Sequence, residues 1–245
     1  ETVLFASPVS EGHSDILSAL KKIKYQTNAR TGGLITHSRI FGFQPRIVLR
    51  RDFCGSAMLG IQQPEETEII FDWAKKADAV YRGVDPERHQ LQTEKAGGVL
   101  DCWRIPGTNF TSGILNKDNA LGYHNDFGNF KDCWSCMFVF ARDIEGGELV
   151  LPELDLAISF PGACLVMFDG SRFLHGVTSI KKRSAAAYRY SVVYYSLKGM
   201  CKCGTPREEL ERIRRVKTQR EFSRLDPEEV KKRHAGKAKV KVEKK

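Results

Sequence analysis

The residues of this chain best suited to chemistry are two histidines and an aspartate, His124, Asp126 and His175. Two imidazoles and one carboxylate can hold a ferrous ion on one face and leave its other coordination positions open. His124 and Asp126 are two positions apart, and His175 follows 51 positions after His124. The pattern predicts a mononuclear iron site built from all three side chains.

Arg189, 14 positions after His175, extends this interpretation. An arginine guanidinium is a planar fork that can donate two charge-assisted hydrogen bonds to one carboxylate. Such a fork, placed one short hairpin beyond the second histidine, is the expected anchor for the dicarboxylate 2-oxoglutarate. The four residues together predict a dioxygenase that uses Fe(II), 2-oxoglutarate and O2.

A His-x-acid pair alone is a weak signal, because a chain with 6 histidines and 30 acidic residues contains about one by chance. His13 and Asp15 form a second such pair in a segment whose apolar residues recur at helical spacing. Residues two apart on a helix point in different directions, whereas in a strand they share a face. The segment before Asp126 reads as a short strand, so we expect His124 and Asp126, and not the earlier pair, to meet at a metal.

The length is that of one domain. A chain of 245 residues can bury a sizeable β-centred core and is too short to require two domains. It starts at Glu1 rather than at methionine, which indicates a processed or trimmed form of a longer protein. It opens with no signal-peptide pattern and has no long apolar run, so neither secretion nor a membrane span is indicated.

The cysteines number seven, an odd count that favours reduced thiols in an intracellular protein over a disulfide framework. Cys133 and Cys136, with Cys201 and Cys203, leave a structural zinc site open as an alternative. The first pair lies in a segment that reads as a strand, where residues three apart face opposite sides. The spacing therefore favours free thiols over zinc.

The net charge of +9 and the pI near 9.2 favour a polyanionic partner, of which nucleic acid is the commonest. Most of the excess lies between Lys231 and Lys245, a segment with almost nothing apolar to bury. This segment is expected to be a disordered basic tail. Whether it is only a solvated end or an arm that binds DNA stays open.

Periodicity predicts helices over 10–25, with Ser10 as N-cap, over 65–82 and over 206–223. A strand is predicted at Arg46–Arg50. Short apolar runs follow from Gly98 onward and predict about eight further strands. They lie at 98–104, 112–116, 121–124, 135–141, 148–151, 156–160, 163–168, 173–177 and 188–197.

These elements predict an α+β fold with a double-stranded β-helix, or jelly-roll, core and flanking helices. The expected organisation is a single dioxygenase domain over 1–205, with N-terminal helices and a strand in 1–95 and the jelly-roll core in 96–200. A C-terminal helix over 206–230 and the tail over 231–245 complete it.

Several stretches carry a family resemblance that covers residues 36–205. Gly146–Pro152, Phe160–Gly162, Cys164–Phe168 and Leu174–Val177 resemble the strand succession of 2-oxoglutarate/Fe(II) oxygenases. Within that superfamily the chain looks most like the TET/JBP family, especially its fungal members associated with transposons. Three segments carry this likeness: Ile40–Cys54, Thr111–Asp126 and Arg189–Ser196.

The resemblance implies that His124, Asp126 and His175 bind iron and that Arg189 holds the far carboxylate of 2-oxoglutarate, with Asn116 lining the co-substrate pocket. It further implies a monomeric nuclear enzyme that acts on double-stranded DNA with a methylated base. The expected reaction oxidises the methyl group of 5-methylcytosine to hydroxymethyl and further oxidised forms. The cysteine-rich region of vertebrate members is missing, so sequence context would be recognised differently.

A base inside a duplex cannot reach a buried iron, so it would be flipped out and stacked on an aromatic side chain. Phe127 and Phe130 are the candidates nearest the motif, with Trp103 and Tyr123 as further ones, although such side chains are more often core. Arg46, Arg50 and Arg51 are candidates for phosphate contacts, although arginines beside a strand are commonly just solvated.

Other functions stay open at this point. An enzyme acting on N6-methyladenine in DNA, or on methylated RNA, would have the same metal centre and a different base pocket. A catalytically inactive nucleic-acid-binding module is disfavoured, because a lapsed site has no need of His124, Asp126, His175 and Arg189 together. A prolyl-hydroxylase-like enzyme is favoured by the Gly146–Pro152 motif alone.

Overall fold

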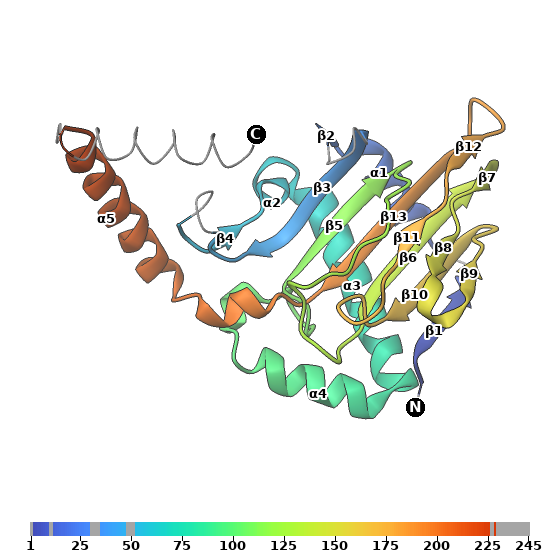
Figure 1. The fold of residues 1–245 in the computed structure, drawn as a ribbon, viewed down its shortest axis with the longest axis horizontal. Coiled ribbons are helices and arrows are strands. Elements are labelled where there is room, and N and C mark those ends of the chain that lie inside the picture. Colours follow the sequence, from blue (N-terminus) through green and yellow to red (C-terminus); the bar gives the residue numbers. More distant parts are fainter. Residues whose placement is uncertain (1, 10–11, 30–34, 48–51, 226–227, 229–245) are drawn as a thin grey trace.

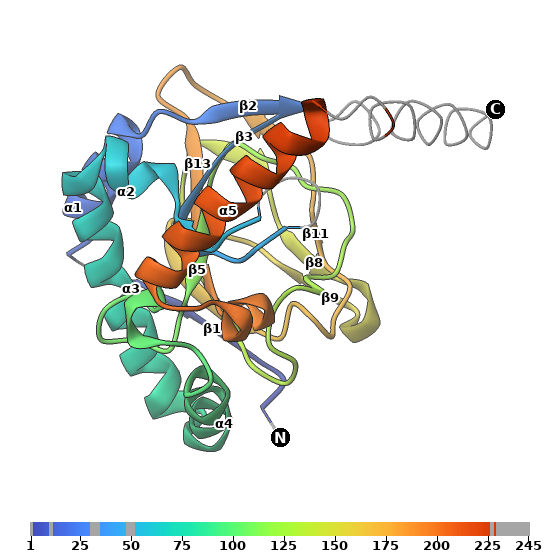
Figure 2. The same ribbon diagram turned by 90° about the vertical axis from the view of Figure 1, so that its left-hand side faces the viewer.

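Two layers of β-structure with helices on one side make up the protein. The computed structural model describes residues 2–9, 12–29, 35–47, 52–225 and 228. Figure 2 shows α1, α2 and α3 on one side, the strands β3, β5 and β13 in the middle, and β8, β9 and β11 on the other side. This arrangement confirms the predicted α+β class with a jelly-roll core.

The main sheet has eight antiparallel strands in the described part of the chain (Figure 1). Seven of them lie in the order β1 (Leu4–Pro8), β10 (Ala163–Phe168), β6 (Ser135–Arg142), β13 (Tyr188–Tyr195), β5 (Ser112–Lys117), β3 (Ile35–Gln44) and β2 (Gln26–Ala29), and β4 (Gly55–Ser56) pairs with β3. β6 is buried on both faces: Phe138 and Phe140 point to the helices, and Met137 and Val139 point to the opposite core.

The second layer consists of two smaller antiparallel sheets. One has the order β11 (Gly176–Val177), β8 (Leu149–Leu151) and β9 (Leu156–Ile158), and the other pairs β12 (Ile180–Lys182) with β7 (Ile144–Gly146). Gly146 has a φ of 76°, and a side chain there would place its Cβ 1.9 Å from the Ser179 carbonyl oxygen. Glycine is therefore required at this end of β7.

Helices cover the free face of the main sheet. They are α1 (Ser14–Lys22), α2 (Met58–Gln62) and α3 (Pro64–Val84). α4 (Pro86–Ala96) packs next to α3, and α5 (Pro206–Leu225) follows the last strand. Three short 3₁₀ helices are η1 (Asp101–Trp103), η2 (Pro152–Leu154) and η3 (Lys198–Lys202). The α3 side chain of Trp73 packs edge-on against Phe138 and Phe140, which ties the helical layer to the centre of the sheet.

Several predicted elements differ in the structure. The helix predicted over 10–25 is observed as Ser14–Lys22, and its expected cap Ser10 lies outside the described residues. α4 was not predicted, because its sequence is mostly polar; its signals were Asp85, whose side chain accepts a hydrogen bond from the Arg88 amide, and Pro86. The strand predicted over 98–104 is absent, and this segment contains turns and the 3₁₀ helix Asp101–Trp103. Residues 48–50 of the strand expected at Arg46–Arg50 lie outside the described residues.

The domain boundaries stay a prediction. The helix predicted over 206–223 is observed as Pro206–Leu225. The whole tail over 231–245 and most of the end of the predicted 206–230 segment lie outside the described residues. Within the described residues no helix is both long and apolar enough to cross a membrane.

Cys54 and Cys203 form a disulfide, so the prediction of reduced thiols is wrong for this pair. The fold brings their Cα atoms to 5.7 Å although 149 positions separate them in the chain. The remaining five cysteines are free, and Cys133 and Cys136 are buried. Among the described residues these cysteines form no group that could hold zinc. Burial raises the pKa of the Cys133 thiol to about 11, which favours its protonated form.

Candidate active site

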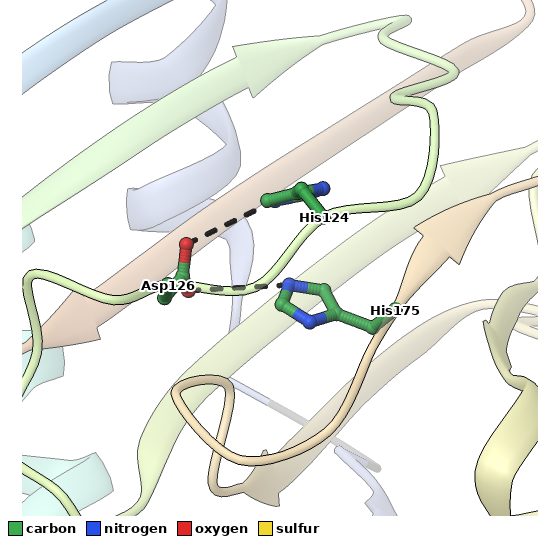
Figure 3. Close-up of side chains that lie close together, drawn as sticks. All are labelled: His124, Asp126 and His175. Carbon is green, nitrogen blue, oxygen red and sulfur yellow. Dashed lines mark ion pairs between the residues drawn. The ribbon is translucent and has the colours of Figure 1, made fainter.

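His124, Asp126 and His175 come together between the two layers, as Figure 3 shows. His124 and His175 lie on neighbouring segments joined by a β-bridge, with backbone hydrogen bonds of 2.9 and 3.0 Å in the two directions. The strand predicted over 121–124 is reduced to this bridge. One ligand atom from each of the three side chains lies within 4.8 Å of the others, and the described residues contain no other such group.

Both imidazoles are oriented by backbone carbonyl groups. Nδ1 of His124 donates to the Gly122 oxygen at 2.8 Å, and Nδ1 of His175 donates to the Phe173 oxygen at 3.0 Å. A carbonyl accepts only, so the proton is on Nδ1 and the Nε2 lone pair is free for a metal. The two Nε2 atoms lie 3.8 and 3.9 Å from the Asp126 carboxylate oxygens.

The buried position of His175 also favours its ligand form. Burial lowers the pKa of His175, and this outweighs the hydrogen bond to Phe173 and the nearby Asp126 carboxylate, which raise it. A neutral imidazole is the form that binds a metal ion.

Asp126 is held by its own backbone and by a tight turn. Its amide donates to the Gly170 oxygen at 2.8 Å. A side chain at position 170 would place its Cβ 2.9 Å from Asp126 Oδ2 and 3.4 Å from His175 Cε1. The same turn is fixed by the buried Asp169, which accepts hydrogen bonds from the amides of Ser171 and Asp132. The sequence interpretation missed Gly170 and Asp169, whose contacts with Asp126 and Asp132 join segments remote in the chain.

A cavity of about 390 Å³ extends from the three side chains into the space between the layers. Apolar side chains from both layers form much of its wall, which reduces the access of water to its interior. They include Ile114, Met137, Leu149, Phe168, Val177 and Val193.

Arg189 lines the same cavity and is only 2% exposed. Its Nε donates to the Gly147 carbonyl oxygen at 3.1 Å, and its guanidinium lies over the Phe160 ring. Its Nη2 is buried and has no hydrogen-bond partner among the described residues. Burial lowers the pKa of Arg189 to about 10, so the group is still a cation at neutral pH.

Asn116 lies in the cavity wall on β5. Its amide donates to Ser191 Oγ at 3.2 Å, and its side-chain oxygen accepts from Asn119 at 3.0 Å. Asn116 and Ser191 are register partners in β5 and β13. The structure therefore places this polar group two positions along β13 from Arg189.

The aromatic candidates divide into two groups. Phe127 lines the cavity and is 72% exposed, and Tyr123 is exposed nearby. Phe130 and Trp103 instead belong to a buried cluster with Met200, away from the cavity lining. Tyr195, which the sequence interpretation did not single out, also lines the cavity.

The basic candidate that the structure describes, Arg46, does not line the cavity. Arg46 forms an ion pair with the buried carboxylate of Glu209. Arg50 and Arg51 lie outside the described residues. In the earlier His-x-acid pair, the His13 ring packs near Phe140 and Asp15 accepts a hydrogen bond from Trp73 Nε1.

The donor set fits the group that the sequence predicts. Three ligand atoms converge from one side with both histidines in the metal-binding tautomer, and the cavity leaves the other side open. A buried guanidinium nitrogen without a partner is costly, and a carboxylate would satisfy it. Arg189 therefore fits one end of a dicarboxylate.

Comparison with known proteins agrees with this assignment of the site. The family described as the oxygenase domain of the 2OGFeDO superfamily, Tet_JBP, matches residues 55–198. Thymine dioxygenase JBP1 of Trypanosoma brucei brucei is 23% identical over 185 residues, which are 74% of this chain and 22% of that protein. The bifunctional helicase and thymine dioxygenase JBP2 of Leishmania infantum is 26% identical over 126 residues, 51% of this chain and 11% of that protein. The chain thus spans less than a quarter of these relatives.

Among solved structures, NgTET1 in complex with 5mC DNA aligns with this chain with a TM-score of 0.53 at 12% identity. The alignment covers 81% of this chain and 94% of the NgTET1 chain. This likeness supports the fold. Closeness to fungal members associated with transposons stays a prediction. The family match over more than half of the chain, on a jelly roll with a His-Asp-His group, leads to one conclusion: the chain belongs to the TET/JBP family of dioxygenases that depend on Fe(II) and 2-oxoglutarate and use O2.

Proposed function

We propose that this chain oxidises the methyl group of 5-methylcytosine in double-stranded DNA after the base is flipped out of the helix. The observation that carries the proposal is the shared cavity. The metal-ligand group lies at one part of its wall, and the exposed Phe127 lies at its rim. Arg189 lies at another part of the wall, and its Nη2 has no hydrogen-bond partner in the part of the chain that the structure describes. NgTET1, with the same fold, is described in complex with 5mC DNA. A nuclear, monomeric protein stays part of this proposal.

In this proposal His124, Asp126 and His175 hold the iron. Iron together with 2-oxoglutarate and O2 supplies the oxidising chemistry that replaces a C–H bond by a C–OH bond. Arg189 orients the co-substrate through its far carboxylate, and Asn116 lines the same pocket. The carbonyl groups of Gly122 and Phe173 keep both imidazoles in the tautomer that leaves Nε2 free. The apolar walls keep water from the reacting methyl group.

The base must leave the duplex because the ligand group lies within a cavity rather than on a convex surface. Phe127 is the aromatic side chain that we assign to stacking on the flipped base or its neighbour. Phe127 is one position from Asp126 and is exposed at the cavity rim. A phenyl ring that faces water can stack on a base without breaking any packing contact of the core. Phe130, buried in another cluster, is not assigned this role.

Thymine is a second candidate substrate. Relatives from Trypanosoma and Leishmania are named thymine dioxygenases, and thymine carries its methyl group on the same C5 atom as 5-methylcytosine. The two bases differ on their pairing edge, an amine against a carbonyl group. Hydrogen-bonding groups around the flipped base would therefore decide between them.

The test is incubation of the protein with Fe(II), 2-oxoglutarate and matched duplexes that contain 5-methylcytosine, only thymine, or N6-methyladenine, followed by nucleoside mass spectrometry. We expect hydroxymethylcytosine from the first duplex. Products only from the second or third would replace 5-methylcytosine by thymine or by N6-methyladenine. His124→Ala is the inactive control, and His13→Ala is the matched active control. Turnover of 2-oxoglutarate without oxidation of any base would contradict DNA as the substrate.

A further inference from the structure

Helix α5 is polar on all sides and lies at the edge of the molecule, where it extends away from the sheets (Figure 1). Among its described side chains the exposed large apolar ones are Leu210 and Phe222, which are about three turns apart and form no stripe. Helices of this kind contribute little to a core, so their stability depends on specific polar contacts. The position of α5 therefore needs a separate explanation.

A buried carboxylate fixes the start of α5. Glu209 is 2% exposed and accepts hydrogen bonds from the amides of Cys54 and Gly204, both at 2.9 Å, and from the Arg46 guanidinium. The Cys54–Cys203 disulfide joins the same two segments. The position of the helix is thus set by polar and covalent links.

A second set of contacts continues along the helix to Asp52. Arg212 Nε donates to the Asp52 carbonyl oxygen at 2.7 Å, and Arg220 pairs with the Asp52 carboxylate. These links use two of the five cations between Arg212 and Phe222, a stretch with Glu221 as its one acidic residue. They hold the side of α5 that faces segment 52–54.

The other cations of this stretch, Arg214, Arg215 and Lys217, are exposed. Within the described residues none of their side chains has a hydrogen bond or ion pair with another side chain. Three positive charges within one turn repel one another and cost stability. Such an arrangement is favourable when an anion lies against it.

A groove lies between η3 and this part of α5, and Lys202 and Arg215 line it. Its two acidic side chains already have partners: Glu208 accepts from the Thr205 amide at 2.7 Å, and Glu211 pairs with Arg207 at 3.2 Å. An amide is neutral, so Glu208 keeps its negative charge, but Lys202, Arg212 and Arg215 outnumber it in the groove lining.

The groove is also close to the active site along the chain. Leu197 lines the active-site cavity, and η3 begins at the next residue, Lys198. A duplex with one base in the cavity has its phosphates within a short distance of that base. The sugar-phosphate chain on the side of Leu197 would then meet η3 and α5.

We propose that η3 and α5 form a phosphate-binding surface for duplex DNA, with Lys202, Arg214, Arg215 and Lys217 as its cations. The proposal rests on the proposed function only in taking a duplex as the substrate. Phosphate contacts require positive charge and no apolar patch. Anionic membranes bind helices with an apolar face, and protein partners need an apolar centre; the described part of α5 has neither.

The test compares wild type with a variant carrying Arg214→Gln, Arg215→Gln and Lys217→Gln. Binding to a 5-methylcytosine duplex is measured against salt concentration. We expect the affinity for the duplex to fall at least about tenfold. The steepness with which the logarithm of the association constant decreases with log salt concentration should be smaller by about 2 to 3, because three phosphate contacts are lost. A control variant, Lys22→Gln, Lys24→Gln and Lys75→Gln, removes three exposed lysines from the helical layer and should bind like wild type.

The proposed phosphate-binding surface is rejected if the salt dependence of the α5 variant equals that of wild type, or if wild type does not bind the duplex. Binding to phosphatidylserine vesicles that depends on the same residues, without duplex binding, also rejects it. Oxidised base is quantified in parallel. If the variant binds more weakly than wild type and neither protein oxidises a base, the phosphate-binding surface is supported and the proposed function is rejected. If both proteins oxidise the base and bind the duplex equally, the proposed function is supported and the phosphate-binding surface is rejected.

Discussion

At the scale of single residues, the metal-ligand group depends on a neighbour that has no side chain. Gly170 lies so close to Asp126 and His175 that a Cβ atom there would come within 2.9 Å of the carboxylate oxygen. The ligand atoms must be held within a fraction of an ångström to bind one ion. Absence of a side chain at this position is therefore part of the site.

We predict that Gly170→Ala displaces the Asp126 carboxylate, weakens Fe(II) binding and lowers kcat/KM roughly 10- to 100-fold. Metal titration and steady-state turnover measure the two effects. The melting temperature should change little, because the contact is with the end of a side chain. Gly162→Ala, where no atom lies within 4 Å of the added Cβ, is the matched control. Equal metal affinity in both variants would argue against this role.

Arg189 gives the second prediction at this scale. Lysine keeps the charge but loses the planar fork and the hydrogen bond from Nε to Gly147. We expect Arg189→Lys to raise the KM for 2-oxoglutarate roughly 10- to 100-fold, as for a charge-assisted hydrogen bond lost in a buried site. Affinity for DNA should be unchanged.

Arg183→Lys serves as the control for this change. Arg183 is exposed and does not line the cavity, and its Nη2 lies 3.5 Å from Glu145 Oε2. If the KM responds to Arg183→Lys and not to Arg189→Lys, the co-substrate carboxylate is held elsewhere.

At the scale of elements, α5 is attached through Glu209. Burial raises the pKa of this carboxyl group, but hydrogen bonds from Arg46 and the amides of Cys54 and Gly204 more than offset it, so the net pKa is lowered. A group with a lowered pKa stabilises the folded state above its unfolded-state pKa, and this is lost as pH falls through the folded-state value. The contribution is therefore complete at neutral pH and disappears in acid, below the ordinary pKa range of glutamate.

We predict that Glu209→Gln releases α5 at neutral pH, because a neutral amide cannot accept from the Arg46 guanidinium and two amides in the same way. Amide hydrogen exchange should become faster in Pro206–Leu225 and stay unchanged in the main sheet. Glu211→Gln is the matched control, since that side chain is exposed and pairs only with Arg207 among the described residues. Equal protection of α5 in the two variants would reject the anchoring role.

At the scale of the whole molecule, the Cys54–Cys203 disulfide closes a loop that contains β4 to β13. A cross-link over 149 positions restricts the unfolded chain strongly. We predict that Cys54→Ser with Cys203→Ser lowers the free energy of unfolding by about 2 to 4 kcal/mol. Urea unfolding with and without reductant measures it, and reductant should bring wild type to the level of the variant.

The control for this prediction is Cys102→Ser with Cys201→Ser, which replaces two exposed free thiols. It should unfold like wild type and respond to reductant in the same way. A wild type whose stability is the same with and without reductant would show that the cross-link does not stabilise the fold.

The sequence alone was enough to predict the centre of the sheet and the chemistry of the site. The apolar runs at 112–116, 135–141, 163–168 and 188–197 correspond to β5, β6, β10 and β13. Strands buried on one or both faces leave a local signal, because each position is selected by its own burial. The residue types His, Asp, His and Arg likewise identify a chemistry whatever the fold around them.

Only the tertiary structure decided which of these candidates meet and how they are oriented. The β-bridge between His124 and His175, the pairing of Arg46 with Glu209 and the Cys54–Cys203 bond join positions whose partnership no local pattern encodes. The contrast between exposed Phe127 and buried Phe130 has the same origin, since two identical side chains three positions apart differ only in what packs against them. Long-range packing determines such pairs, because contact between remote segments depends on the whole fold and on no single stretch of the chain.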